Sequence, residues 1–473
     1  MQVRLDGHTL TIPDLVTIAS GATGITVDPA ALALVEKSHD GLREARARGS
    51  VYGANTGVGA NRHESAGDPD GHALRLLRSH CAAVGPVEDD GTARAVMAVR
   101  LNQILAGGSG VSRRVAETLV TALRDGAVPT LHRWGAIGTA DLAPLAELAL
   151  TLAGDRPWRH GTGPVIALDA TDALPLISSS ALTVATSALA VADVHSHLRA
   201  STIIAALSFL ALRGNPEAFH PAVHAARAHP HQIALAETLN DLVTGAAPAL
   251  RIQDPFGLRV VPQVTAPALH AAESLTTAVT AELNAAVENP LVTVDGVRHH
   301  GQFHTATLAA GLDAVRAAYL PVLSLSAARL GLLMRPDMTG LRSFLADGPP
   351  GSSGLMITEY VVQDLLAEMR ATVQPTAAGT LTISLGLEEH ASFATQGARS
   401  LRTMTGLAPT LLGAELLAAV RALRLAPDRL AAGPLQDAYD LAAAALSPDL
   451  TDRPLDTDLT AAAGLIPDLG ALL

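Results

Sequence analysis

The chain has 473 residues, of which 48% are hydrophobic, 16% are charged and only 3% are aromatic, and its formal net charge is −12. This mixture supplies a large core and favours helix over strand, because Ala and Leu enter a helix at little cost in side-chain freedom. The one lysine (Lys37) and the absence of a basic stripe argue against a nucleic-acid partner, and the one cysteine (Cys81) excludes an intrachain disulfide.

In chain order, residues 1–30 read as a small strand-and-turn start, and helical patterns alternate with Gly/Pro loops from Pro29 onward. Helices are predicted over 92–106, 115–125, 141–154, 182–212, 268–287, 305–332, 358–371, 391–405 and 413–425. The pattern predicts a mainly all-α fold. An N-terminal region over 1–200 holds the Gly-rich loops, and a long-helix bundle with the C-terminal helices fills 201–473.

The sequence does not indicate export or a membrane span. The N-terminus lacks the apolar core of a signal peptide, and the longest apolar run, 203–212, is interrupted by Ser208 and ends at Arg213. That run is about half of the roughly 20 residues that a transmembrane helix requires. We therefore expect a buried core helix, no membrane partner and a cytoplasmic location.

Five segments carry polar or glycine-rich motifs. Residues 51–59 read VYGANTGVG, where three glycines within seven residues allow a sharp turn and close approach to a ligand, although an ordinary surface loop is the alternative. The others are LRSHC (77–81), LHRWGAIGTADLAPL (131–145) and LPLISSS (174–180), followed later by QDPFGLR (253–259). For LRSHC, a helix histidine packed in the core is the alternative to a ligand contact.

Together these segments resemble the signatures of the histidine and aromatic amino acid ammonia-lyases, in the family's order. Further matches lie at 100–102 with 108–111, 282–290, 302–304, 353–356 and 387–390, so the resemblance runs from about residue 50 to about residue 400. It implies an ammonia-lyase/fumarase-like long-helix bundle, a homotetramer with active sites built from more than one chain, and a small-molecule carboxylate substrate.

The resemblance also implies roles for single residues. Tyr52 corresponds to the base that removes the β-proton, for which a phenol of pKa about 10 must be depressed by its neighbours. Glu388 corresponds to the glutamate that faces the amine, and Arg259 to the arginine whose planar fork binds the carboxylate. Ser79 and His80 stand where the family contacts the substrate side chain, and this pair is associated with histidine as substrate.

Several positions depart from the family pattern. Ser178 replaces an asparagine that bonds the prosthetic ring, and Phe256 replaces a tyrosine. Phe303 lies in the matched segment 302–304. We place Ser178, Phe256 and Phe303 among the substrate-binding residues. The family's Ala-Ser-Gly, which cyclises into an electrophilic methylidene-imidazolone, is replaced by Gly138-Thr139-Ala140.

From these departures we expect no methylidene-imidazolone. The Cβ of Ala140 penalises positive φ, Gly138 adds flexibility that opposes closure, and dehydration of Thr139 would give a more hindered ethylidene. Thr139 is then an ordinary hydroxyl in the pocket, and Tyr52, Thr139 and Glu388 are the catalytic candidates.

Three hypotheses follow for function. The first is a lyase-like enzyme that acts at the Cα–Cβ bond of a histidine-like or other polar carboxylate without the electrophile, by elimination, addition or isomerisation. The second is a histidine-type ammonia-lyase with a cyclised Gly-Thr-Ala, and the third is a non-catalytic ligand-binding homologue. We expect no metal, because His195 and His197 point apart on a helix and Pro221 disturbs the spacing of His220 and His224.

Overall fold

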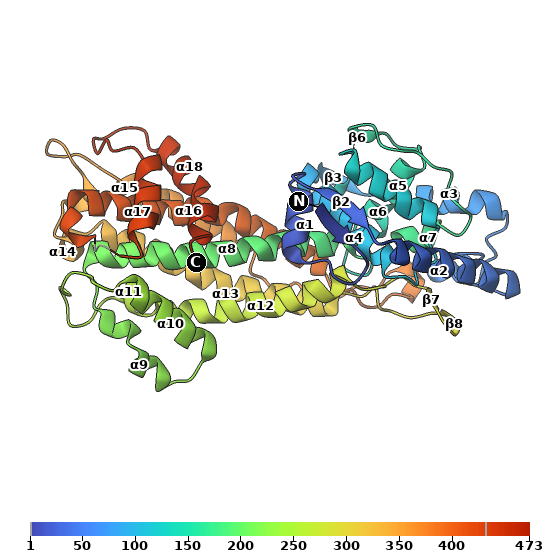
Figure 1. Cartoon of the computed structure of the whole chain (residues 1–473), viewed down its shortest axis with the longest axis horizontal. Coiled ribbons are helices and arrows are strands. Elements are labelled where there is room, and N and C mark those ends of the chain that lie inside the picture. Colours follow the sequence, from blue (N-terminus) through green and yellow to red (C-terminus); the bar gives the residue numbers. More distant parts are fainter. Residues whose placement is uncertain (1, 431–432) are drawn as a thin grey trace. The chain divides into compact units, whose positions relative to one another are not determined.

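The computed structural model describes residues 2–430 and 433–473 of the chain, without the side chains of residues 69 and 70. The mainly helical fold predicted from the sequence is confirmed (Figure 1). The chain divides into two compact units. Unit 1 comprises Met1–Ala192, Leu275–Asp313 and Pro375–Arg399, and unit 2 comprises Asp193–Ser274, Ala314–Gln374 and Ser400–Leu473.

Most of unit 1 is formed by short helices and two-stranded sheets. Its helices are α1 (Ile12–Ala19), α2 (Pro29–Arg48), α3 (Pro69–His80), α4 (Asp90–Leu105), α5 (Arg113–Arg124), α6 (Leu142–Leu152) and α7 (Ala173–Ile177), with 3-10 turns η1 (Gly59–Asn61) and η4 (Ser384–Gly386). Its strands are β1 (Gln2–Leu5), β2 (Gly24–Val27), β3 (Val84–Val87), β4 (Val128–Pro129), β5 (His132–Trp134), β6 (Trp158–His160), β7 (Leu291–Thr293) and β8 (Gly296–Arg298). They pair as β1 with β2 in parallel, and as β3 with β5, β4 with β6 and β7 with β8 antiparallel.

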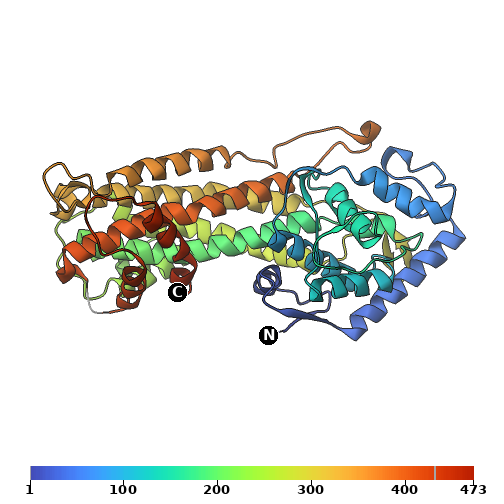
Figure 2. The ribbon, with the colours of Figure 1, turned by 90° about the horizontal axis from the view of Figure 1, so that it is seen from above.

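Unit 2 is helical in its described residues. Its shorter elements are η2 (Pro216–Phe219), α9 (Pro221–Ala225), α10 (Pro230–Leu242), α11 (Phe256–Arg259), α14 (Pro336–Thr339), η3 (Ser343–Leu345), α15 (Met356–Ala371), η5 (Pro427–Arg429), α17 (Gln436–Ala445), α18 (Asp456–Gly464) and α19 (Ile466–Gly470). The long helices α8 (Ala181–Leu212), α12 (Val261–Leu283), α13 (Ala306–Leu333) and α16 (Ala394–Leu425) contribute residues to both units, and within unit 2 they run side by side (Figures 1 and 2). The sequence predicted a single boundary near residue 200, whereas these helices make the two units alternate along the chain.

Two local predictions were wrong. The start of the chain contains helix α1 as well as strands, because Thr11 and Asp14 form a reciprocal capping box and a proline occupies the first turn. The predicted helices over 391–405 and 413–425 are one continuous helix, α16, which contains Pro409. The burial of the apolar face of α16 stabilises the helix by more than Pro409 destabilises it, so the helix continues through the proline.

Three helical stretches are long and apolar enough to cross a membrane: Ala173–Leu212, Ala306–Leu333 and Ala394–Leu425. The length of these helices therefore does not exclude a membrane span, whereas the apolar run 203–212 alone had been judged too short for one. The apolar window of the first stretch is entirely buried inside the protein, as a core helix requires. The cytoplasmic location stays a prediction.

A buried ion pair lies in the core of unit 2. Arg329 and Glu415 are at most 2% exposed, and two N–H groups of Arg329 donate to Glu415 at 2.6 and 2.9 Å. The hydroxyls of Ser208 and Ser326 also donate to this carboxylate, at 2.7 and 2.5 Å. Because every oxygen of the buried carboxylate has donors, the pair joins α8, α13 and α16 without an unsatisfied charge.

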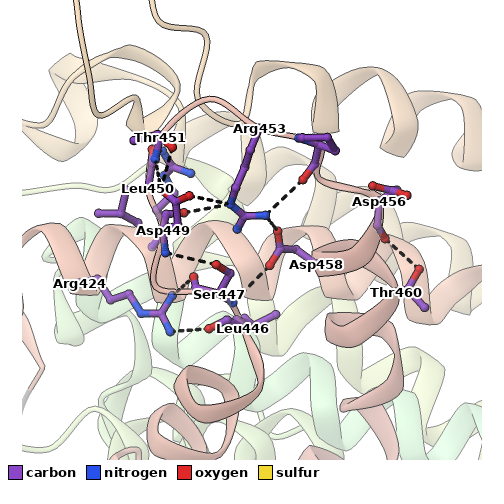
Figure 3. A network of polar contacts seen from close by, with 12 residues as sticks. Arg424, Leu446, Ser447, Asp449, Leu450, Thr451, Arg453, Asp456, Asp458 and Thr460 are labelled. Atoms are coloured by element: carbon purple, nitrogen blue, oxygen red, sulfur yellow. Dashed lines mark hydrogen bonds and ion pairs between the residues drawn. The ribbon is translucent and has the colours of Figure 1, made fainter.

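A polar network holds the C-terminal segment between α17 and α18 (Figure 3). Arg453 pairs with the buried carboxylate of Asp458 at 2.5 Å and lies 3.9 Å from Asp449. Arg424 donates to the backbone carbonyls of Ser447 and Leu446 at 2.6 and 2.9 Å. These bonds satisfy the carbonyls exposed where α17 ends.

The buried histidine of α8 predicts a pH dependence of stability. Burial, assisted by the charge of Arg402, lowers the pKa of His197 to about 4, and its Nδ1 lies 2.8 Å from the hydroxyl of Tyr319. The unfolded chain binds this proton near pH 6.5 and the folded chain does not, so stability is complete above pH 6.5 and falls as the pH drops toward 4.

We expect a loss of about 3 kcal/mol in the free energy of unfolding over that window, measured by urea denaturation. The variant His197→Gln keeps a polar side chain but has no titrating group, so its curve should be flatter by that amount. Equal slopes for the two proteins would contradict the assignment.

Candidate active site

The glycine-rich loop at 51–59 positions Tyr52 in unit 1. Asn55 fixes the loop by accepting from the amide of Val51 at 2.7 Å and donating to the carbonyl of Gly49 at 2.8 Å. The loop then folds back, so that the amide of Gly59 donates to the Tyr52 hydroxyl at 2.7 Å. Gly59 has a φ of +58°, which accounts for glycine at this turn.

The pKa of Tyr52 is raised above that of a free phenol. Burial of the phenol is the main cause; the Gly59 amide lowers the pKa, and the carboxylate of Glu388 raises it again. The phenol is therefore protonated at neutral pH, and its pKa is shifted in the direction opposite to the depression that a base requires. A cation bound beside the phenol would shift its pKa downward.

Glu388 lies on a second loop that contacts the first. The carbonyl of Glu388 accepts from the amide of Ile383 at 2.9 Å, which closes a short hairpin around η4. In this hairpin the Ser384 hydroxyl accepts from the amide of Ala60 at 3.0 Å. The loop of Tyr52 and the loop of Glu388 are thereby joined directly.

The residues Gly138, Thr139 and Ala140 form a tightly held turn. The φ angles of Gly138 and Ala140 are +80° and +90°. A Cβ at position 138 would lie 2.1 Å from the Ser392 hydroxyl, so only glycine fits there. Among the described residues the Thr139 hydroxyl has no hydrogen-bond partner, and this side chain is half-buried.

The serine run at the end of α7 links this turn to other candidates. The Ser178 hydroxyl accepts from the amide of Asn289 at 3.1 Å, and Ser180 donates to the carbonyl of Phe303 at 3.1 Å. The carbonyl of Ser179 accepts from the amide of Asp141 at 2.7 Å. The structure thus connects Ser178 and Phe303, through neighbouring residues, to the segment that follows Ala140.

Ser79 and His80 end helix α3. The Ser79 hydroxyl donates to the carbonyl of Leu76 at 2.8 Å, and Nδ1 of His80 lies 2.8 Å from the same carbonyl. A ring nitrogen beside a carbonyl carries the proton, so in the neutral ring Nε2 of His80 keeps its lone pair as an acceptor.

Phe256 and Arg259 belong to unit 2, on α11. The guanidinium carbon of Arg259 lies 4.5 Å from the centre of the Phe256 ring, and Phe256 is 63% exposed. With the Gln253 amide oxygen facing the guanidinium, Nη1 and Nη2 of Arg259 donate to it at 2.7 and 3.1 Å. In the part of the chain that the structure describes, Arg259 makes no ion pair, and its Nε is buried without a partner.

Comparison with known proteins shows the family. A model of the aromatic amino acid lyases matches residues 10–444. The chain belongs to the aromatic amino acid lyase family. It is 31% identical to the histidine ammonia-lyase of Clostridium tetani (strain Massachusetts / E88), over 90% of this chain and 88% of that one. The histidine ammonia-lyase of Streptomyces coelicolor (strain ATCC BAA-471 / A3(2) / M145) is 32% identical over 96% and 94%.

The solved structures agree with this membership. A histidine ammonia-lyase from Trypanosoma cruzi superposes with a TM-score of 0.90 at 26% identity, covering 100% of this chain and 94% of that one. A tyrosine aminomutase from Streptomyces globisporus superposes with a TM-score of 0.92 at 25% identity, over 100% and 98%. This lyase family member is therefore an enzyme of the carbon–nitrogen lyase superfamily.

The expectation that this lyase lacks the methylidene-imidazolone is wrong. Its relatives are histidine ammonia-lyases, whose electrophile is that group, and the altered tripeptide does not show it to be absent. The turn also contradicts two of the physical arguments. Ala140 adopts positive φ despite its Cβ, and Gly138 is held between its neighbours rather than flexible. The backbone of residues 138–140 thus fits the bent conformation that ring formation requires, although Thr139 would supply an ethylidene.

The histidines weighed as metal ligands have other partners. His224 lies 2.9 Å from the carbonyl of Ala218 through Nε2 and 3.0 Å from the Gln232 amide through Nδ1. Nδ1 of His220 accepts from the amide of Ala222 and caps α9. Across residues 2–430 and 433–473, no group of three or more His, Cys, Asp or Glu side chains has the arrangement of a metal site.

The sequence motifs did not indicate Thr305 and Ser392, whose hydroxyls donate to the Gly138 carbonyl, or Ser384, which joins the two loops. Thr305 directly follows the matched segment 302–304, and Ser392 lies two residues after 387–390. Their positions next to these matched segments were the only indication in the sequence that they lie near the site.

The positive φ of Ala140 predicts a stabilising substitution. We expect Ala140→Gly to raise the free energy of unfolding by about 1 kcal/mol, because a Cβ at φ near +90° is strained. Ala136 is a matched control in the same loop, since it is buried without positive φ and Ala136→Gly should destabilise. Guanidinium denaturation measures both, and a lower stability for Ala140→Gly would refute the strain.

Proposed function

We propose that this enzyme is a histidine-type ammonia-lyase. It removes the amine from the Cα of an amino acid with an imidazole-like side chain, together with a proton from Cβ. The observation that carries the proposal is the pair Ser79–His80, in which the free lone pair of His80 Nε2 can accept an N–H. A phenyl side chain offers no such donor, whereas an imidazole does.

Arg259 supports an α-carboxylate substrate. Its guanidinium is held by stacking on Phe256 and by the neutral amide of Gln253, so its charge has no counter-ion among the described side chains. A carboxylate supplies that counter-ion through bidentate hydrogen bonds. In keeping with the family resemblance, we propose a homotetramer in which Phe256 and Arg259 of one chain serve the site of a neighbouring chain.

Tyr52 and Glu388 act on the protons. The substrate ammonium is attracted by the Glu388 carboxylate, and its charge beside the phenol favours the tyrosinate that takes the β-proton. The prosthetic ring, when formed from residues 138–140, supplies the electrophile that makes the amine a better leaving group. Without this ring the amine would remain a poor leaving group, and the proposed elimination would have no electrophile to drive it.

Product analysis tests this proposal. Histidine should yield urocanate, followed by its near-ultraviolet absorbance, at a kcat/KM at least about 100-fold above that for cinnamate formation from phenylalanine. His80→Phe should reverse much of that preference, and Arg78→Gln, an exposed neighbour, serves as control. Faster release of cinnamate, or formation of a β-amino acid instead of urocanate, would contradict the assignment. Analytical ultracentrifugation measures the oligomeric state.

A further inference from the structure

We propose that Thr305 and Ser392 form a donor site that activates the carbonyl of Gly138 for backbone cyclisation, and that the ring made from Gly138, Thr139 and Ala140 carries an ethylidene group. The inference deepens the proposed function and rests on it for the use of the ring. It concerns how this chain, with its own tripeptide, makes an electrophile.

The first observation is the number of donors around a single oxygen. The Gly138 carbonyl is approached by the Ser392 hydroxyl at 2.8 Å, the Thr305 hydroxyl at 3.0 Å and the Thr305 amide at 3.3 Å. A carbonyl oxygen offers two lone pairs, whereas the alkoxide of a tetrahedral centre offers three. Three donors therefore match the attacked form of the carbonyl better than its resting form, as in an oxyanion hole.

The second observation is that these donors are buried and oriented. Thr305 and Ser392 are 1% and 2% exposed, so water does not compete for the Gly138 carbonyl. The amide of Ala394 donates to the Ser392 hydroxyl at 3.1 Å, and the Ser392 and Thr305 hydroxyls lie 3.0 Å apart, so both hydroxyls are held in place beside the carbonyl. Hydrogen bonds that are fixed in advance in a dry environment stabilise developing negative charge strongly.

The third observation is that both flanks of the tripeptide are anchored. Before it, the carbonyl of Ile137 accepts from the amide of Phe393 at 2.9 Å, and that of Ala136 accepts from the Gln396 side chain at 3.0 Å. After it, the Asp141 amide donates to Ser179 at 2.7 Å. The two positive φ angles between these anchors bend the backbone before reaction, which reduces the entropy lost on closure.

The chemistry balances without an oxidant. The Ala140 amide nitrogen bonds to the Gly138 carbonyl carbon, and its proton passes to the former carbonyl oxygen. That hydroxyl leaves as water with the N–H proton of Thr139, which forms a ring C=N bond. The Thr139 hydroxyl then leaves as a second water with the Thr139 Cα proton, giving an exocyclic double bond to a carbon that bears a methyl group.

Intact-mass spectrometry of the purified full chain is the test. The wild-type chain should be lighter than its encoded mass by two waters, and Thr139→Ala by one at most, because it keeps cyclisation but has no hydroxyl to lose. The double variant Thr305→Val/Ser392→Ala should contain at least about 10-fold less cyclised chain. Thr395→Val is the matched control: its buried hydroxyl bonds Thr183 rather than Gly138, and it should cyclise as wild type does.

The outcomes separate this inference from the proposed function. An uncyclised wild-type mass overturns the inference even if urocanate is released, whereas a cyclised mass without urocanate overturns the proposed function alone. Full cyclisation in a folded double variant, with a circular dichroism spectrum like that of wild type, refutes the donor role. If the double variant does not fold, Thr305→Ser and Ser392→Thr, which keep the hydroxyls, must cyclise for the donor role to stand.

Discussion

Replacing Tyr52 by phenylalanine should lower kcat by about 10²- to 10⁴-fold, the range expected for loss of a general acid–base group. The Tyr52 hydroxyl is the only part of the side chain that the substitution removes, and its ring contact with His299 is kept. The Gly59 amide loses its acceptor, so a decrease in stability of about 1 kcal/mol should accompany the loss of activity.

The pH dependence of kcat/KM gives a second measurement of the role of Tyr52. Because burial and Glu388 raise the pKa of Tyr52 above its usual value, the tyrosinate fraction of the free enzyme increases with pH over the whole neutral and mildly alkaline range. The kcat/KM of wild type should therefore rise with pH in that range, and that of Tyr52→Phe should not. Tyr360→Phe, at a position that is 66% exposed, is the control and should match wild type. A Tyr52→Phe enzyme with wild-type kcat and pH profile would remove Tyr52 from the mechanism.

Removing the guanidinium of Arg100 should destabilise the protein by about 3–5 kcal/mol, the cost of leaving a buried charge without its partner. Arg100 and Glu288 are fully buried, and Nη1 of Arg100 lies 2.7 Å from the Glu288 carboxylate. Arg100 also donates to the carbonyls of Leu176 and Pro175 at 2.9 and 2.6 Å. The variant Arg100→Met therefore releases the backbone that leads into Ser178.

The loss should depend on pH in a defined direction. Burial already raises the pKa of Glu288, and Arg100 opposes that rise, so the pKa rises further in Arg100→Met. The folded variant then holds a proton that the unfolded chain releases above about pH 4.3, and its stability falls as the pH increases. Urea denaturation at pH 5 and pH 8 measures the difference, which should be larger at pH 8.

A second substitution serves as the control for Arg100. Arg100→Met/Glu288→Gln removes both charges and should recover part of the loss, because no ionised group remains buried. A double variant no more stable than Arg100→Met at pH 8 would show that the carbonyl contacts, and not the charge pair, dominate.

The sequence predicted the long helices well because their apolar periodicity is strong and their burial is extensive. Segment 182–212 was predicted nearly to its ends, since its all-round apolar character has one stable solution, a core helix. The capped helix α1 and the continuity of α16 through Pro409 were missed, because they depend on a local side-chain bond and on tertiary packing that periodicity does not report.

The site was predictable as a set of residue types but not as a geometry. The motifs led to Tyr52, His80 and Glu388, yet no pattern in the sequence indicated that the Tyr52 phenol is bonded by the Gly59 amide and is more basic than usual. The conclusion drawn from Ala140 failed for a related reason. Steric repulsion makes positive φ unfavourable for a residue with a Cβ, but the surrounding hydrogen bonds can hold the backbone in that conformation.

The bond between the Ala60 amide and the Ser384 hydroxyl has a consequence for substitutions at Ser384. This serine belongs to neither motif, yet its hydroxyl joins the segment that carries the Tyr52 phenol to the segment that carries the Glu388 carboxylate. Removing this hydroxyl should therefore affect the proton acceptor and the partner of the ammonium together, without touching either side chain.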